Sequence, residues 1–412
     1  MSGLNFLNKL LDGVDVEWLS LGELGDFIRG NGLQKKDFVE SGFPAIHYGQ
    51  IYTRYGLSAD KTFTYVLPEL ANKLRKAQKN DLLLATTSEN DEDVVKPLAW
   101  LGDNVAISGD MMLFRHEQNV KYLAYFFQSE IFQTQKMKYI TGAKVRRVSS
   151  GDLSKIKIPI PCSNNPEKSL AIQSEIVRIL DKFTALTAEL TAELTAELNM
   201  RKKQYNYYRD QLLSFKDGEV EWKTLGEVAQ YSKTRISFEL LDERNYVGVD
   251  NLLQNRAGKS LSNHVPTSGK LTEFIPTDIL IGNIRPYLKK IWQADCIGGT
   301  NGDVLVIRCI DSSINTRYLY QILADDKFFE YNMQHAKGAK MPRGSKEDIM
   351  KYPIPVPPLT LQARIVEILN KFDTLTNSIT EGLPREIELR QKQYEYYRDL
   401  LFSFPKPETA SN

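Results

Sequence analysis

The sequence predicts an α+β protein in which two similar mixed α/β domains are separated by a pair of long antiparallel coiled-coil helices, with a pseudo-twofold internal repeat. The chain has 412 residues, which is more than one ordinary domain holds. Its segments recur in order, and its centre repeats Thr-Ala-Glu-Leu three times from Thr187 to Leu198. A strand alternates its faces every two residues, whereas a period of four follows the helical turn of about 3.6 residues. The centre of the chain is therefore predicted to be helical.

Internal repetition is the main evidence for two domains. Three segments of the first half return in the same order in the second half: Val16–Glu23 as Val220–Glu227, Ile158–Pro161 as Ile354–Pro357, and Gln204–Asp210 as Gln393–Asp399. The separation between the copies shrinks along the chain, as small deletions in loops would produce. The pattern therefore indicates an old duplication of one unit.

Each copy begins with a block of short apolar runs, flanked by Gly, Asn or Asp, that are typical of strands. The expected strands are Ala45–Ile51, Asp81–Ala85 and Asp110–Phe114 in the first block, and Tyr246–Val249, Asp278–Gly282 and Asp303–Ile307 in the second. An aromatic helix is expected after them, at Tyr122–Gln128 and at Tyr318–Leu323. Both blocks are therefore predicted to mix strands and helices.

A long helix is predicted after each block, because Pro166 and Pro358 stand where proline favours a helix start. The first helix is expected from Ser169 to Ser214. Apolar residues spaced by four form a ridge on each helix: Leu186, Leu190, Leu194 and Leu198 on the first, and Leu375, Ile379, Leu383 and Ile387 on the second. We expect the two ridges to pack against each other and form a spacer. Gly382 and Pro384 are expected to kink or interrupt the second helix.

These segments divide the chain into five parts. The parts are a first globular domain at 1–165, a central spacer helix with the Thr-Ala-Glu-Leu repeats at 166–215, a second globular domain at 216–357, a distal spacer helix at 358–404, and a flexible tail at 405–412.

Net charge and cysteine content exclude several classes of protein. Lys and Arg (53) nearly balance Asp and Glu (52), so any nucleic-acid surface has to be local. The three cysteines are odd in number and lack CxxC spacing, which favours a reducing compartment. We find no signal-peptide pattern and no apolar run of about 18 residues, so the protein is expected to be cytoplasmic.

Catalytic and metal-binding motifs are not found in the sequence. It contains no GxxxxGK[ST] phosphate loop, no GxGxxG after a strand, no GxSxG elbow and no HExxH. The four histidines are scattered without metal-ligand spacing. The acidic cluster Asn90–Asp93 near Lys96 faintly suggests a metal-dependent nuclease, although such clusters are usually solvated loops. We therefore expect no catalytic residue and no metal site.

Basic residues that recur at equivalent places are the candidates for DNA binding. Two runs without acidic residues, 131–150 and 332–346, carry Lys136, Lys138, Lys144, Arg146 and Arg147 in the first copy and Lys337, Lys340 and Arg343 in the second. A solvated face explains either run alone, but their recurrence favours phosphate and base contacts. The loops that follow one predicted strand of each block add Thr86, Thr87 and Ser88 in the first copy and Arg285, Tyr287, Lys289 and Lys290 in the second. The side chains of these two loops differ, as recognition of two different DNA sequences would require. Surface loops of duplicated domains also diverge without such a role.

The chain resembles the specificity subunit of type I restriction-modification systems. The Thr-Ala-Glu-Leu run at Thr187–Leu198 resembles the central repeat of the IC-type members, and the Gln-Tyr-x-Tyr-Tyr-Arg-Asp segments at Gln204 and Gln393 resemble the ends of the arm helices of this family. The resemblance covers nearly the whole chain and is more specific in the arms than in the globular blocks.

The resemblance implies a non-catalytic subunit with two target-recognition domains, each binding one half of a split, asymmetric double-stranded DNA site. It further implies that the arms bind two methyltransferase subunits, and that ATP-driven restriction subunits join this core. S-adenosylmethionine, ATP and Mg are then expected in the partner subunits, with no cofactor on this chain. In this family a longer Thr-Ala-Glu-Leu run goes with a longer unread gap between the half-sites.

A different class of function is a stand-alone DNA-binding regulator or a coiled-coil scaffold protein. That alternative predicts specific DNA binding, or another partner, without any methyltransferase. No helix-turn-helix is evident in the sequence, which counts modestly against a regulator.

Overall fold

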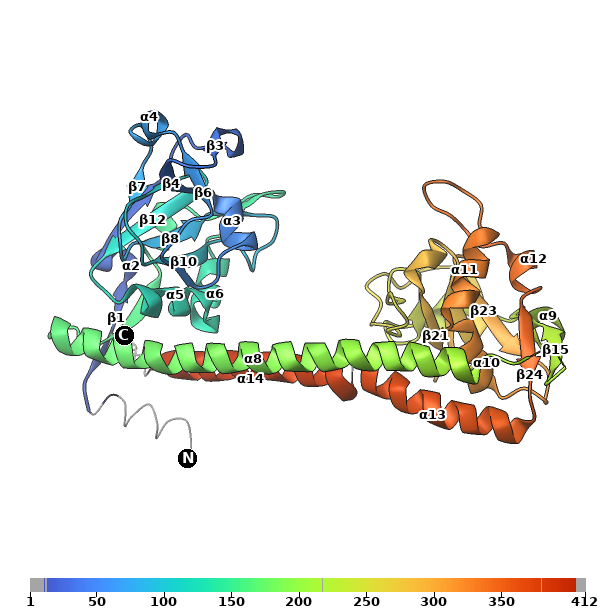
Figure 1. Cartoon of the computed structure of the whole chain (residues 1–412). Helices are drawn as coiled ribbons and strands as arrows, with labels where there is room; N and C mark the ends of the chain where they lie inside the picture. The colour runs from blue at the N-terminus through green and yellow to red at the C-terminus, as the bar shows by residue number, and fades with distance from the viewer. Residues whose placement is uncertain (1–10, 12, 217, 379, 405–412) are drawn as a thin grey trace. The chain divides into compact units, whose positions relative to one another are not determined.

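The computed structural model describes residues 11, 13–216, 218–378 and 380–404. The chain forms two compact units (Figure 1). The first unit contains the residues up to Glu189 and those from Gln391 onward, and the second contains Leu190–Arg390. Each unit therefore contains one globular block and parts of the long helical segments that follow the two blocks.

The first unit contains two five-stranded sheets. One has the order β2 (Gly25–Arg29), β12 (Met111–His116), β8 (Leu82–Ala85), β10 (Lys96–Trp100) and β5 (Ser58–Ala59). The other has the order β3 (Phe38–Val39), β6 (Thr64–Val66), β4 (Phe43–Ile46), β11 (Val105–Ile107) and β7 (Lys76–Ala77). Its helices are α2 (Leu21–Leu24), α3 (Tyr48–Thr53), α4 (Pro68–Ala71), α5 (Val120–Gln128), α6 (Glu130–Met137) and α7 (Ser150–Leu153).

Strand β8 shows why this sheet is covered on both faces. All four of its residues are buried, and successive side chains of a strand point to opposite faces. Leu82 and Leu84 join the core formed with α5, whereas Leu83 and Ala85 join the core formed with β11 and α3. Helices α5 and α6 lie between this sheet and the long helices of the same unit (Figure 1). The core therefore connects the globular block to its helices.

The second unit repeats this plan with two four-stranded sheets. One has the order β16 (Ala229–Tyr231), β23 (Val304–Cys309), β20 (Ile279–Gly282) and β21 (Ile291–Gln293). The other has the order β17 (Arg235–Ser237), β19 (Lys270–Phe274), β22 (Gly298–Thr300) and β18 (Tyr246–Val247). Its short helices are α9 (Leu225–Val228), α10 (Thr316–Leu323), α11 (Asp326–Gln334) and α12 (Lys346–Ile349). Along β20, Ile279 and Ile281 face α10 and Leu280 faces the other core, as in β8.

An ion pair with a buried carboxylate recurs in the two central sheets. Arg115 contacts Asp81 at 2.7 Å in the first unit, and Arg308 contacts Asp278 at 2.7 Å in the second. Both carboxylates are almost fully buried and each accepts a further backbone hydrogen bond. A buried charge is tolerated only when it is paired and hydrogen-bonded, so these pairs hold the edges of the central strands together.

Two of the repeated sequence segments pair with each other in space. β1 (Val16–Ser20) is antiparallel to β14 (Lys157–Pro161), and β15 (Glu221–Thr224) is antiparallel to β24 (Pro353–Val356). Each two-stranded sheet thus joins the beginning of a block to its Pro-rich end. The long helices are α8 (Pro166–Leu212), α13 (Leu359–Asn377) and α14 (Gly382–Phe402).

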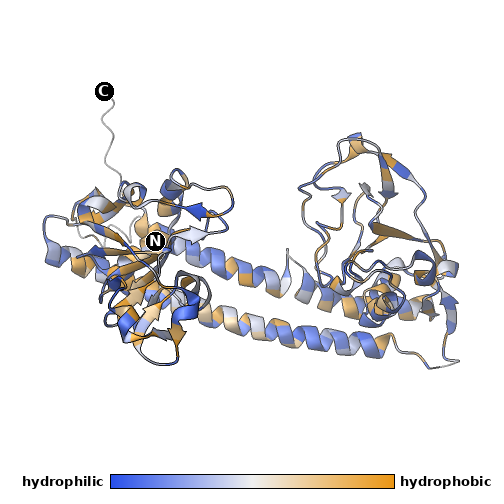
Figure 2. Ribbon diagram, turned by 90° about the horizontal axis from the view of Figure 1, so that it is seen from above, coloured by the Kyte–Doolittle hydropathy of each residue, from blue (hydrophilic) through white to orange (hydrophobic). Residues whose placement is uncertain are grey.

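Aromatic rings stack between the long helices inside each unit. In the first unit, Phe183 of α8 stacks on Tyr397 of α14 with ring centroids 5.2 Å apart. In the second, Tyr205 and Tyr208 of α8 stack on Phe372 of α13 at 5.8 and 5.4 Å. Figure 2 shows apolar residues gathered in the sheets of the first unit and in short bands along the long helices.

A fully buried glutamine anchors each long helix to its block. Gln173 of α8 accepts a hydrogen bond from the backbone N–H of Asn119 at 3.0 Å, and its amide donates to Gln118 and Ser169. Gln362 of α13 accepts from the N–H of Asn315 at 2.8 Å and donates to two backbone carbonyls. The two glutamines occupy equivalent positions of the repeat.

The predicted fold class is confirmed, including the aromatic helices α5 and α10. The first long helix, expected from Ser169 to Ser214, extends from Pro166 to Leu212. The strand expected at Ala45–Ile51 is only partly correct, because β4 ends at Ile46 and α3 begins at Tyr48. The His47 side chain accepts a hydrogen bond from the Gly49 N–H and so caps that helix.

The expected interruption of the second long helix lies just before Gly382. Helix α13 ends at Asn377 and α14 begins at Gly382, whose φ is +76°. A Cβ there would lie 2.5 Å from the Thr374 carbonyl oxygen, so only glycine fits. Pro384 belongs to the first turn of α14, where its missing N–H has no helical acceptor to lose.

The leucine ridge of α8 needs a correction at Leu186, which is 51% exposed. Residues spaced by four are rotated by about 40° from one to the next around a helix. A ridge with this spacing therefore winds around the helix and does not face one packing partner along its whole length. Leu190, Leu194 and Leu198 are half-buried, and Thr187 and Thr191 are half-buried in place of Leu186. Leu375, Leu383 and Ile387 are also half-buried, while Ile379 and the predicted tail at 405–412 lie outside the described residues. Contact between the two ridges stays a prediction, and so does the five-part division of the chain.

Replacing the buried carboxylate by an amide is expected to destabilise the second unit. In Asp278→Asn, Arg308 loses its ionic partner inside the sheet, which should lower the free energy of unfolding by about 3 kcal/mol. Urea unfolding measures the change. The control Glu367→Gln removes an exposed pair with Lys371 on α13 and should have little effect. Equal losses in the two variants would contradict a structural role for the buried pair.

Candidate nucleic-acid interface

Two loops of the first unit that are far apart in sequence form one surface. β9 (Thr87–Ser88) pairs with β13 (Arg146–Arg147) in antiparallel register, with Arg146 opposite Ser88 and Arg147 opposite Thr87. The hairpin of β13 is closed by reciprocal backbone hydrogen bonds of 2.9 Å between Thr141 and Arg147. We call residues 86–88 and 141–147 the first platform.

The second unit brings the equivalent loops together in the same way. Lys337 and Arg343 exchange two backbone hydrogen bonds of 2.9 Å, and Arg343 also forms a bridge with Ile284. The backbone N–H of Arg285 donates to the Pro342 carbonyl at 2.8 Å. We call residues 283–289 and 337–343 the second platform. The sequence predicted basic residues in both loops, but not the pairing that joins them.

Six of the predicted DNA-binding cations are exposed and have no side-chain partner among the described residues. They are Lys138, Lys144 and Arg147 on or beside the first platform, and Arg285, Lys337 and Lys340 on the second. Tyr287 of the second platform is 50% exposed. The two platforms therefore present free cations to solvent, with different side chains at equivalent places.

Other predicted cations are tied to acidic groups. Arg146 contacts Asp91 at 2.8 Å and donates to the Gly142 carbonyl. Arg343 contacts Asp303 at 2.9 Å, and Lys289 contacts Asp326 at 2.7 Å. These pairs stabilise the loops and leave less positive charge for a ligand.

Lys136 and Lys290 are corrections to the predicted DNA contacts, because both side chains are buried. The Lys136 ammonium donates to the carbonyls of Glu92 and Val94 at 2.8 and 3.0 Å, and burial lowers its pKa to about 8. The Lys290 ammonium donates to the Val249 carbonyl, and burial lowers its pKa as well. The spacing of the sequence could have predicted the burial of Lys136, because this residue lies one turn after Phe132 and therefore on the same, inward face of α6.

The threonines predicted as contacts lie below the surface. Thr86 and Thr87 are buried, and the Thr86 hydroxyl donates to the Asp110 carbonyl at 3.0 Å. Ser88 is half-buried at the edge of the ladder. The threonines therefore shape the first platform, which corrects their predicted role as direct contacts.

Sequence reasoning missed the glycine that closes the second platform. A Cβ on Gly344 would lie 2.2 Å from the Asn332 Oδ1 atom and 2.8 Å from the Asn283 Oδ1 atom. Asn332 is fully buried and Asn283 nearly so. The hairpin can lie this close to the 283–289 loop only because residue 344 has no side chain.

The acidic cluster of the first unit is part of its loop structure. The Asn90 amide donates to the Asp93 carboxylate at 2.8 Å, and Asp91 pairs with Arg146. In the part of the chain that the structure describes, no group of three or more His, Cys, Asp or Glu is placed to hold a metal ion. The arrangement gives no support to the nuclease interpretation.

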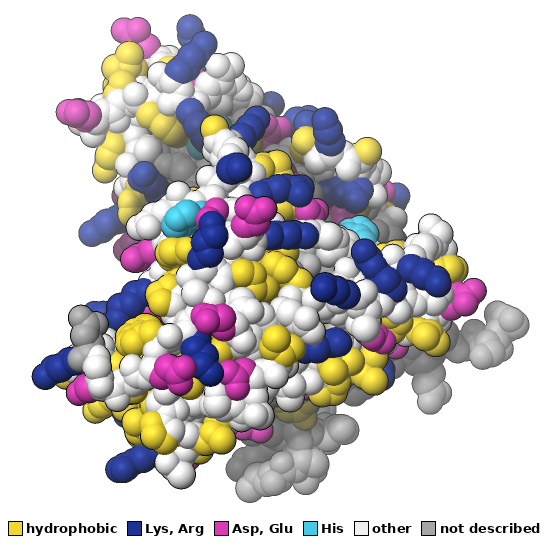
Figure 3. Space-filling model, turned by 90° about the vertical axis from the view of Figure 1, so that its right-hand side faces the viewer, with side chains coloured by type: hydrophobic (Ala, Val, Ile, Leu, Met, Phe, Trp, Pro, Cys, Tyr) yellow, Lys and Arg dark blue, Asp and Glu magenta, His cyan; other side chains and the backbone are white. Residues whose placement is uncertain are grey.

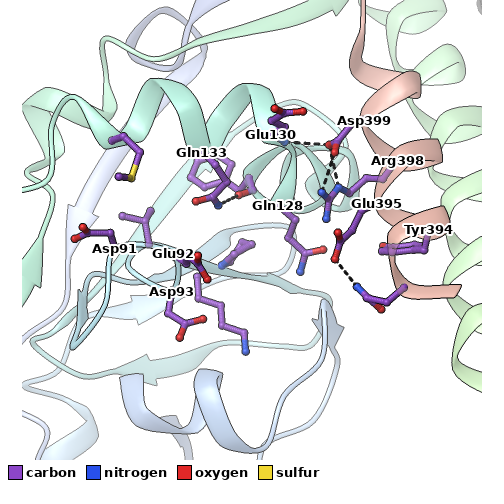
Figure 4. A pocket seen from close by; sticks show the side chains of 16 residues that line it. Asp91, Glu92, Asp93, Gln128, Glu130, Gln133, Tyr394, Glu395, Arg398 and Asp399 are labelled. Atoms are coloured by element: carbon purple, nitrogen blue, oxygen red, sulfur yellow. Dashed lines mark hydrogen bonds and ion pairs between the residues drawn. The ribbon is translucent and has the colours of Figure 1, made fainter. Parts of the chain in front are cut away.

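A cleft of about 940 Å³ lies beside this cluster, between the 91–97 loop, α6 and the end of α14 (Figure 4). Asp399 accepts a hydrogen bond from the backbone N–H of Glu130 at 3.0 Å and pairs with Arg398 at 3.1 Å. The lining carries more acidic than basic side chains, so this cleft is not a candidate for binding DNA phosphates. On the face drawn in Figure 3, Lys and Arg side chains lie among acidic and apolar ones. The platforms, rather than a large basic patch, are the candidate interface.

The middle tyrosine of the Gln-Tyr-x-Tyr-Tyr-Arg-Asp segment is strongly exposed in both units, and Tyr208, which follows it on α8, is also 44% exposed. Tyr207 is 60% exposed on α8, and its equivalent Tyr396 is 63% exposed on α14. The other tyrosines of the segments stack within the unit or are more covered. An exposed aromatic side chain at the same place of both copies is a candidate contact for a repeated partner.

Comparison with known proteins identifies the family. The model of the type I restriction modification DNA specificity domain matches residues 13–200 and again residues 218–389. The chain belongs to the family of type I specificity subunits. It is therefore a non-catalytic subunit of a restriction-modification system, whose role is the recognition of a bipartite DNA site.

Relatives of known name match along their full length. The chain is 42% identical to the specificity subunit of the Escherichia coli enzyme EcoR124I/EcoR124II, over 100% of both chains. It is 34% identical to the specificity subunit of the E. coli enzyme EcoprrI, over 92% of this chain and 93% of the relative. A solved structure described as showing complex assembly and conformational transition of the type I R-M system shares the fold, with a TM-score of 0.61, 16% identity and coverage of 94% and 97%. The regulator and scaffold alternatives are thereby set aside.

The buried Lys136 is expected to make the stability of the first unit depend on pH. Its pKa is about 8 in the folded state, against about 10.4 for an unfolded lysine, so between these values the unfolded state binds more protons. Stability should therefore rise as the pH increases from about 8 towards about 10. Urea unfolding at several pH values measures this rise.

Two variants test whether Lys136 itself causes this pH dependence of stability. Lys136→Met should abolish the rise, and Lys138→Met, which alters an exposed lysine at the end of the same helix, should keep it. A rise of the same size in Lys136→Met would contradict the assignment.

Proposed function

We propose that each unit binds one half of an asymmetric double-stranded DNA site through its platform. The observation that carries the proposal is that both units bring the same two loops together and differ in the side chains they expose there. A shared backbone frame would place both platforms on DNA in the same manner, and the different side chains would select different bases.

The exposed lysines suit the phosphate backbone. A lysine ammonium is a flexible point charge, which neutralises phosphates without reading sequence. Lys138 and Lys144 would act in this way on one half-site, and Lys337 and Lys340 on the other. The side chains of Arg147, Arg285 and Tyr287 are better suited to contact base edges, either alone or in addition to phosphates.

The long helices are proposed to set the gap between the half-sites. One Thr-Ala-Glu-Leu unit adds about 6 Å and about 40° of helix. A DNA base pair adds about 3.4 Å and about 35°. One repeat unit therefore rotates the helix by about as much as one base pair rotates DNA, and it adds more length than one base pair does. A longer run of repeats would suit a longer unread gap.

Membership of the family supports a proposal about partners and cofactors. We propose that two methyltransferase subunits bind the long helices, one at each repeated arm segment, and that restriction subunits join through them. S-adenosylmethionine, ATP and Mg would act in those partners, with no cofactor on this chain. In the described part of the chain no helix has the length and apolarity to cross a membrane, and the three cysteines are unpaired. We place the assembly in the cytoplasm, where cellular DNA is accessible.

Exchange of one globular block tests the division of the DNA site. Residues 30–150 are replaced by the corresponding residues of a family member with another target, leaving β1, β14 and the long helices unchanged. With its methyltransferase, the hybrid should methylate a motif in which one half is new and the other half and the gap are retained. Sequencing of methylated DNA gives the motif. A change in both halves, or in neither, would refute one half-site per unit.

Replacement of the exposed arm tyrosines tests the partner contact. Exposed aromatic residues often contribute most to an interface, so Tyr207→Ala and Tyr396→Ala should each weaken one methyltransferase contact by about 10- to 100-fold. Native mass spectrometry should show complexes with one methyltransferase for each single variant and none for the double variant. The control Glu193→Ala changes an exposed residue of α8 outside the Gln204–Asp210 segment. This variant should still bind two methyltransferase subunits. Full occupancy in the double variant would place the contact elsewhere.

A further inference from the structure

Arg285 occupies an unusual backbone position in the second platform. Its φ and ψ are 52° and 65°, in the left-handed region that residues with a side chain seldom adopt. The position is fixed nonetheless: its N–H donates to the Pro342 carbonyl, and its own carbonyl accepts from the Leu288 N–H at 2.9 Å. The next residue, Pro286, is buried. The backbone that carries this side chain is therefore held from both loops of the platform.

The Arg285 side chain is exposed and has no partner among the residues that the structure describes. The cations nearest to it along its own loop, and Arg343 of the facing hairpin, differ in this respect. Asp303 holds Arg343, Asp326 holds both Arg256 and Lys289, and Lys290 is buried on a backbone carbonyl. The acidic groups of this region are thus engaged by other cations, and all five N–H donors of the Arg285 guanidinium stay available.

We propose that Arg285 reads a guanine in the half-site bound by the second unit. An arginine that donates two parallel hydrogen bonds to the O6 and N7 atoms of guanine is the commonest specific contact in the major groove. Such a contact needs a free guanidinium on a fixed backbone, and Arg285 supplies both. The inference rests on the proposed function, since it takes the second platform to lie on DNA.

The other exposed cations of the second platform suit a different task. Lys337 and Lys340 lie on the hairpin that pairs with the Arg285 loop, and each ends in a single ammonium group. They would hold the phosphates on either side while Arg285 reaches the base edge. Positioning and reading are thus divided between the two loops of one platform.

The first platform differs at the equivalent position. Thr87 pairs with Arg147 as Ile284 pairs with Arg343, so Ser88 is the counterpart of Arg285. A serine hydroxyl both donates and accepts, and it does not select guanine as an arginine does. The two units would therefore read different bases from one backbone frame, as an asymmetric site requires.

The first test uses the wild-type chain with its methyltransferase. Sequencing of methylated DNA gives the motif, and the exchange of residues 30–150 shows which half belongs to the second unit. We expect a G·C pair in that half. A half-site without any G·C pair overturns the proposal. Failure of the exchange to change only one half would instead refute the proposed function, so the two failures are distinguishable.

The second test uses Arg285→Lys and Arg285→Asn in the same complex. Lysine keeps the charge without the paired donors, and asparagine tolerates a left-handed backbone. Binding is measured on a duplex that carries the wild-type motif and on duplexes substituted at each base pair. Both variants should bind the motif about 10- to 100-fold more weakly and lose the preference for guanine at one base pair only. The control Lys351→Ala, an exposed residue after α12, should keep wild-type affinity and preference.

Two outcomes would overturn the proposal. If Arg285→Lys retains the full preference while Arg285→Asn weakens binding equally on every sequence, Arg285 contacts a phosphate rather than a base. Unchanged binding in both variants, with unchanged thermal unfolding, places Arg285 away from the DNA.

Discussion

The buried glutamines Gln173 and Gln362 are the constraint on which each unit depends. An amide inside a protein must satisfy its donors and its acceptor, and here the acceptor is used by the N–H of Asn119 or Asn315, the residue that caps α5 or α10. One side chain of the long helix therefore fixes the start of the helix that covers the central sheet. Because α5 and α10 form the core with β8 and β20, this contact sets the orientation of each sheet on its long helix.

This anchor matters for function because a DNA-reading surface must be held at a defined angle. Within each unit the order of contacts is the same: long helix, capped helix, central sheet, and then the loop that leaves the sheet and forms half of the platform. Thr86 and Asn283 begin these loops directly after β8 and β20. The paired carboxylates Asp81 and Asp278 hold the same strands from the other end. Rigid elements thus carry the loops, and variation in the loops leaves the frame intact.

The duplication, the helix starts at Pro166 and after Pro358, and the interruption before Gly382 were predictable from the sequence, because each depends on local conformational rules. The fate of individual side chains was not. Lys136 and Lys144 stand in the same acid-free run, yet one is buried on two carbonyls and the other is exposed. That difference depends on the 91–95 loop, more than 40 residues away in sequence, folding over α6. The leucine ridge failed at Leu186 for a simpler reason: a period of four drifts against a helix of about 3.6 residues per turn.

The platforms also explain how a chain with a net charge of +1 can serve as a DNA-recognition subunit. Contacts in which Lys or Arg neutralises a phosphate supply most non-specific affinity, and they need cations that are not already paired with acidic groups. Only a few cations on each platform are free of acidic partners, and the lining of the cleft beside α14 carries more acidic than basic side chains. In the function we propose, this chain would select the sequence while its partner subunits supply much of the phosphate neutralisation. A low intrinsic affinity then favours specificity, since a subunit without partners would not be held on random DNA.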